Sequence, residues 1–167
     1  MVIKGDEVTI QVSNEIEFKR TYNVVFADEF GLDNVIKREV IHLKKGNRIE
    51  IRIKRTNSNN LQGLRIATIS KDVSLKYKRD VKREHWFWEN KIGHRKIVLS
   101  IDGDGYIMIY NACYIQGNKI MPGAVSSNTD YAGMVVERID DTTFMYYCND
   151  FAKSTEFQSL VFQLKIK

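Results

Sequence analysis

Basic and aromatic side chains are interleaved between residues 71 and 96 of this 167-residue chain. Cations neutralise carboxylates and phosphates, while tryptophan and arginine are enriched at protein interfaces and aromatic rings stack on unpaired bases. From this segment we predict a binding surface made of Lys82, Arg83, Trp86, Trp88 and Arg95. The same composition also fits a surface strand or helix whose tryptophans point into the core and whose cations point into water.

The kind of partner can be inferred from whether the chain also carries a known nucleic-acid-binding motif. No RRM, KH or cold-shock signature is found in the chain, so the pattern favours a protein partner with an acidic surface. Single-stranded nucleic acid, or another polyanion, is the alternative.

The positive charge is concentrated in the middle of the chain. Residues 37–96 carry 18 basic and 6 acidic side chains, whereas residues 1–36 carry 3 and 7 and residues 97–167 carry 5 and 8. Clustered cations set up a potential of several kT that attracts an anionic partner. Two arrangements fit this pattern: the cations gather on one exposed side, or the acidic flanks pack beside them and neutralise them.

Residues that support catalysis or metal binding show no recognised spacing. The three histidines, at 42, 85 and 94, lack zinc-site spacing, and Cys113 and Cys148 lie beside apolar or aromatic residues rather than cations. Nucleophile-elbow and phosphate-loop motifs are missing from the sequence. We therefore expect a non-enzymatic binding protein without a cofactor or metal. A hydrolase whose two carboxylates meet only on folding is the remaining alternative.

The run Asp102-Gly-Asp104-Gly resembles the first residues of a calcium-binding loop. The fifth and twelfth positions of such a loop need oxygen ligands, but here they are Tyr106 and Cys113. Asp-Gly also supplies the backbone angles of a tight hairpin. The run therefore predicts a hairpin turn.

Strict alternation of polar and apolar residues over 47–55 predicts a half-buried strand. Its isoleucines, at 49, 51 and 53, should face the core. Arg48, Arg52 and Lys54 should then face outward, where they extend the binding surface or form a solvated strand face.

Similar β-rich runs recur along the chain, which predicts a single all-β domain over residues 1–167. They lie at residues 7–12, 22–27, 64–69, 96–101, 106–110, 134–139, 143–147 and 160–166. Together with 47–55 they give about nine strands, which we expect to form an antiparallel β-sandwich, with a small up-and-down β-barrel as the alternative. At most one short helix is expected, near residues 77–91, and a strand over residues 86–88 is an equal alternative there. An unpaired strand edge would allow a homodimer.

Targeting signals give the last expectation. The chain has no apolar run of the roughly 20 residues that a membrane helix needs, and its first residues lack a signal-peptide core. With two cysteines only, a disulfide framework is not expected. We therefore expect a cytoplasmic protein that does not bind membranes.

Overall fold

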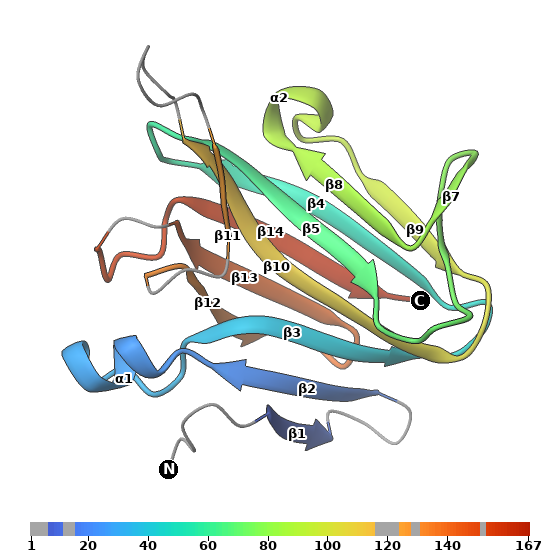
Figure 1. Cartoon of the computed structure of the whole chain (residues 1–167), viewed down its shortest axis with the longest axis horizontal. Coiled ribbons are helices and arrows are strands. Elements are labelled where there is room, and N and C mark those ends of the chain that lie inside the picture. The colour runs from blue at the N-terminus through green and yellow to red at the C-terminus, as the bar shows by residue number, and fades with distance from the viewer. Residues whose placement is uncertain (1–6, 12–15, 116–123, 128–130, 151–152) are drawn as a thin grey trace.

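The computed structural model describes residues 7–11, 16–115, 124–127, 131–150 and 153–167, which form fourteen strands and two short helices (Figure 1). The first eight strands are β1 (Glu7–Gln11), β2 (Glu17–Tyr22), β3 (Ile36–Leu43), β4 (Arg48–Thr56), β5 (Leu61–Thr68), β6 (Leu75–Tyr77), β7 (Asp80–Lys82) and β8 (Glu84–Trp88). The other six are β9 (Ile97–Ile101), β10 (Gly105–Ile115), β11 (Ala124–Ser127), β12 (Gly133–Arg138), β13 (Thr143–Asn149) and β14 (Leu160–Ile166). The helices are α1 (Val24–Phe30) and α2 (Glu89–Ile92). The predicted all-β class is confirmed.

All of the described strands belong to one antiparallel sheet that is nearly closed into a barrel. The main order is β7-β6-β9-β4-β14-β13-β12-β3-β10-β5-β8, with β2 also beside β3. A single residue pair, Met134 with Ile36, joins β12 to β3. The continuous sheet is therefore closer to the barrel alternative than to two separate sheets, although its strand order is not that of an up-and-down barrel. Periodicity cannot distinguish these folds, because each has one buried and one exposed face.

The rolled sheet encloses one main hydrophobic core. Ile49, Ile51 and Ile53 of β4 are buried as predicted. They share the core with Phe18 of β2 and Leu64 of β5, which lie on the other side of the β12–β3 junction in the strand order. Rolling the sheet thus brings strands distant in its order into contact through their side chains.

One charged pair lies inside this largely apolar interior. Glu39 of β3 is fully buried and accepts hydrogen bonds from Arg20 Nε at 2.7 Å and from Arg20 Nη2 at 3.1 Å. The hydroxyl of buried Tyr146 donates to the same carboxylate at 2.8 Å. Burial raises the pKa of Glu39, and Arg20 opposes that shift. The carboxylate therefore depends on its partners to remain charged in the core.

The helix α1 replaces the strand that we predicted over residues 22–27. Asn23 caps the helix, because its side chain accepts a hydrogen bond from the Val25 amide at 3.0 Å. Gly31 ends it with a φ of +68°, a left-handed conformation that favours glycine. These short-range caps outweigh the β propensity of Val24 and Val25, whereas Tyr22 ends β2.

Of the two alternatives for residues 77–91, strands form over most of the span, and the described chain has two short helices where at most one was predicted. This span contains the end of β6 and all of β7 and β8, and only its last three residues belong to α2, which runs from Glu89 to Ile92. The alternating burial of β8, in which His85 and Phe87 are buried and Trp86 is exposed, is typical of a strand with one inward face.

The predicted hairpin at residues 102–105 does not form, because β9 and β10 are not paired with each other. The run instead carries the chain between different parts of the sheet. Asp102 accepts a hydrogen bond from the Ser74 amide at 2.7 Å and Asp104 accepts one from the Lys45 amide at 2.8 Å. The two aspartates thus anchor neighbouring connections. Among the described helices, none is long and apolar enough to cross a membrane.

The buried ion pair gives a stability prediction. Arg20→Met leaves the Glu39 carboxylate buried without its cation, so the free energy of unfolding should fall by about 3–5 kcal/mol. Because the pKa of Glu39 is raised in the folded state, that state binds a proton more readily than the unfolded chain. The variant should therefore recover stability as the pH is lowered from about 7 to about 5, measured by urea unfolding.

Arg138→Met is the control, since the Arg138–Asp141 pair is exposed. Its effect should stay below about 1 kcal/mol at both pH values. Equal losses in the two variants would show that Glu39 does not need its arginine.

Candidate functional site

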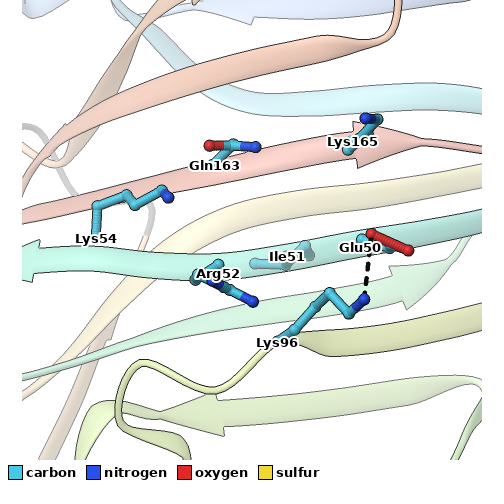
Figure 2. Close-up of a pocket in the computed structure, with 7 residues that line it drawn as sticks. All are labelled: Glu50, Ile51, Arg52, Lys54, Lys96, Gln163 and Lys165. Atoms are coloured by element: carbon cyan, nitrogen blue, oxygen red, sulfur yellow. Dashed lines mark ion pairs between the residues drawn. The ribbon is translucent and has the colours of Figure 1, made fainter.

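The outward face of β4 and β14 is shallowly hollowed and carries mostly cations. Figure 2 shows this hollow, of about 280 Å³, which we call the β4–β14 hollow. It is lined by Glu50, Ile51, Arg52, Lys54, Lys96, Gln163 and Lys165. Strand register explains the set: Gln163 lies opposite Arg52 and Lys165 lies opposite Glu50, so their side chains share one face.

Glu50 is the only carboxylate among the residues lining this hollow. Its oxygens lie 3.0 Å from Lys167 Nζ and 3.7 Å from Lys96 Nζ. The hydrogen bond from Lys167 is the main cause of a lowered pKa, with further contributions from Lys96 and Lys165. Glu50 is therefore ionised at neutral pH. One negative charge faces Arg52, Lys54, Lys96 and Lys165.

A second hollow, of about 380 Å³, adjoins the first and is called the β9 hollow. It is lined by Arg48, Lys76, Tyr77, Lys78, Lys96, Val98 and Ser100. Lys96 lines both hollows, so they adjoin at this side chain. The residues lining the β9 hollow include four cations and no carboxylate.

A third and larger opening, of about 460 Å³, follows β8 and is called the β8 groove. It is lined by Tyr77, Asp80, Lys82, Glu84, His85, Trp86, Phe87, Trp88, Lys91, Ile92 and Arg95. Tyr77 also lines the β9 hollow. The three openings therefore form one series across β8, β6, β9, β4 and β14.

The inner wall of the β8 groove is aromatic. Tyr77 packs edge-on against Phe87, with ring centroids 5.0 Å apart, and the ring of His85 stacks on Phe87. His85 Nε2 lies 2.8 Å from the backbone oxygen of Leu75. These contacts connect β8 to β6, which are not neighbours in the sheet.

The outer side of β8 carries a stacked tryptophan pair. The rings of Trp86 and Trp88 lie 8° from parallel with centroids 5.9 Å apart. The guanidinium of Arg65 lies 5.7 Å from the centroid of the Trp86 ring. The same group forms an ion pair with Glu84, in which Nε lies 2.8 Å from the carboxylate. Trp86 keeps 38% of its surface exposed, which makes it one of the exposed large apolar residues of the described chain.

Gly63 of β5 makes room for Trp88. A Cβ atom at this position would lie 2.5 Å from Trp88 Cε3 and 2.7 Å from the Phe87 carbonyl oxygen, both far inside van der Waals contact. Trp88 therefore lies across the neighbouring strand, which only glycine allows without displacement.

The structure brings seven of the eight predicted binding residues to this series of openings. Lys82, Trp86, Trp88 and Arg95 line the β8 groove, Arg48 lines the β9 hollow, and Arg52 and Lys54 line the β4–β14 hollow. Arg83 is the exception, because its guanidinium donates to Thr68 Oγ1 at 3.2 Å and to the Ser70 carbonyl at 3.3 Å.

The predicted set omitted four lysines of the basic segment 71–96 that line the openings, Lys76, Lys78, Lys91 and Lys96, and it omitted Gln163 and Lys165 of β14. The alternation over residues 160–166, which predicted that strand, also places Gln163 and Lys165 on its outward face. Their position beside β4 depends on strand pairing between distant parts of the chain.

The acidic flanks do not neutralise these cations through ion pairs among the described residues. Lys82 pairs with Asp80, Arg65 with Glu84 and Lys96 with Glu50, so each partner comes from residues 37–96. Flanking carboxylates pair elsewhere, as in Lys153–Glu29 and Arg138–Asp141. Lys165 and Lys167, which belong to the acidic C-terminal third of the chain, instead add positive charge at the β4–β14 hollow.

The openings are lined mainly by cations and aromatic rings. Asp80 and Glu84 line the β8 groove but form ion pairs, and the hydrogen bond from Arg65 lowers the pKa of Glu84. The thiol of Cys148 is buried, which raises its pKa well above the usual range. In the part of the chain that the structure describes, no cluster of three metal-ligating side chains is found.

Comparison with protein-family models, with curated proteins and with solved structures finds no match to this chain.

The position of Trp88 gives a second prediction. Gly63→Ala should displace the Trp88 ring, lower the free energy of unfolding by about 1–3 kcal/mol and shift the tryptophan emission spectrum. Gly103→Ala is the matched control, because its Cβ would meet only Val73 Cγ2 at an ordinary 3.5 Å. Urea unfolding and fluorescence test both variants. If they behave alike, Trp88 does not pack across β5.

Proposed function

We propose that this chain is a non-enzymatic binding protein that recognises an acidic segment of a protein partner. The three linked openings form its contact surface. Cations of the β4–β14 and β9 hollows attract the partner, and the tryptophan pair beside the β8 groove supplies apolar contact area.

The observation that carries this proposal is the excess of cations over carboxylates across the two hollows. Their lining residues include Arg48, Arg52, Lys54, Lys76, Lys78, Lys96 and Lys165 against Glu50 alone. Lys96 and Lys167 already engage Glu50, so the other cations have no carboxylate partner among the residues lining the hollows. A surface of this kind raises the association rate of an acidic partner and repels basic ones.

The tryptophan pair favours a protein over single-stranded nucleic acid. A base would need an open ring face on which to stack. The ring of Trp86 already stacks on Trp88 and lies beside the guanidinium of Arg65, so part of its π surface has partners within the chain. Apolar side chains can contact the part of Trp86 that stays exposed without stacking on it, which makes a peptide the better fit.

Binding of poly-L-glutamate tests the proposal. The affinity should fall steeply between about 50 and 200 mM salt, because charge attraction provides it. Arg52→Glu with Lys165→Glu reverses two cations of the β4–β14 hollow, and this double variant should bind at least about tenfold more weakly with a flatter salt dependence. Isothermal titration calorimetry provides the affinities.

Lys19→Glu with Lys37→Glu is the control for net charge. These lysines lie on β2 and β3, away from β4 and β14 in the strand order, and the double variant changes the charge by the same amount. Its affinity should stay within about twofold of the parent chain once the global charge effect is removed by added salt. Equal weakening of the two double variants, or no polyglutamate binding, would overturn the proposal. Stronger quenching of tryptophan emission by oligothymidylate than by polyglutamate would replace the protein partner with nucleic acid.

A further inference from the structure

The free edge of β8 suggests how the partner is held. We infer that an extended acidic segment of the partner adds to β8 as an extra strand in the β8 groove. This inference rests on the proposed acidic protein partner and specifies its conformation. Strand addition is a common mode of peptide recognition, in which main-chain hydrogen bonds provide affinity and alternate side chains provide specificity.

The first support is the position of β8 at one end of the strand order. Among the described strands it pairs only with β5. The Thr68 amide donates to the Arg83 carbonyl at 2.8 Å, which identifies that residue pair as a hydrogen-bonded one. Because such pairs alternate along an antiparallel ladder, the main-chain groups of Glu84 and Trp86 point away from β5.

The second support is the lining of the groove. All five residues of β8 line it, although successive side chains point to opposite faces of the sheet. A groove that contacts both sets of side chains must follow the edge of the strand. The unpaired main-chain groups of β8 therefore face the space that a new strand would occupy.

The third support is charge. Lys91 and Arg95 line the groove, and the guanidinium of Arg95 donates to the carbonyl oxygens of Ile92 and Lys91 rather than to a carboxylate. Neither cation forms an ion pair with a described carboxylate. The two acidic residues of the groove, Asp80 and Glu84, already pair with Lys82 and Arg65. The uncompensated charge of the groove is positive, which selects an acidic occupant.

The same charge argues against a second copy of the chain. A second copy would bring its own Lys91 and Arg95 but no uncompensated groove carboxylate to pair with them, because Asp80 and Glu84 of each copy already form ion pairs. The two sides of the groove also predict how apolar and acidic residues are arranged along the bound peptide. Its inward side chains would meet Tyr77, Phe87 and Ile92, whereas its outward side chains would lie beside Trp86 and the exposed cations of the groove. Apolar and acidic residues should therefore alternate.

The probe is a capped octapeptide of alternating glutamate and valine, with tryptophan emission and calorimetry as readouts. Alternate amides of a bound strand point to opposite edges, so the glutamate amides face one way and the valine amides the other. N-methylation of the set that faces β8 should weaken binding at least about tenfold. N-methylation of the other set should leave the affinity within about twofold, and a lysine–valine peptide should bind at least about tenfold more weakly.

The outcomes separate this inference from the proposed function. Equal effects of the two N-methylated sets, or no binding of the glutamate–valine peptide while polyglutamate still binds, would overturn strand addition and leave the acidic partner in place. Loss of polyglutamate binding as well would overturn both. A dimer in analytical ultracentrifugation that excludes the peptide would show that β8 instead pairs with its own copy.

Discussion

A single antiparallel sheet has two faces, and the need to bury one of them determines the rest of this structure. The described strands meet that need by rolling up until Ile51 of β4 and Leu64 of β5 share one core. Rolling fixes which side chains of every strand are inside and which are outside. It also brings the two ends of the sheet, β7 with β6 and β8, close together without main-chain pairing between them. The β8 groove lies between these ends. The core and the candidate site are thus consequences of the same closure.

The outward face of β4 could be predicted because its information is local. Alternation along one strand assigns Ile49, Ile51 and Ile53 to the core and Arg48, Arg52 and Lys54 to the surface, and burial agrees. The position of Lys165 beside that face could not be predicted, because it depends on the register between β4 and β14. The series from the β8 groove to the β4–β14 hollow likewise depends on Tyr77 and Lys96, which line adjacent openings only after folding. Periodicity therefore identifies faces, whereas pairing between distant strands assembles them.

The errors of prediction have causes that strand periodicity does not capture, some short-range and some long-range. In α1, the Asn23 cap and the left-handed Gly31 outweigh a run of strand-forming residues. At residues 102–105, Asp-Gly is suited to a tight hairpin, yet the carboxylates of Asp102 and Asp104 bind amides of other connections. The buried Arg20–Glu39 pair carries no sequence signal either, because a charged residue within a β-rich run is normally expected on the outward face.

The two ends of the sheet differ in a way that bears on function. Natural sheets protect their edge strands with short length and charge, and β7 fits this description, because its three residues are exposed and include Asp80 and Lys82. At the other end, β8 is longer and places an exposed tryptophan beside its unpaired main-chain groups. Gly63 is kept free of a side chain where Trp88 crosses β5, and Arg65 pairs with Glu84 beside Trp86. An edge that merely avoided aggregation would not need this arrangement. Its aromatic support and the neighbouring cations are better explained by a partner strand that completes the sheet.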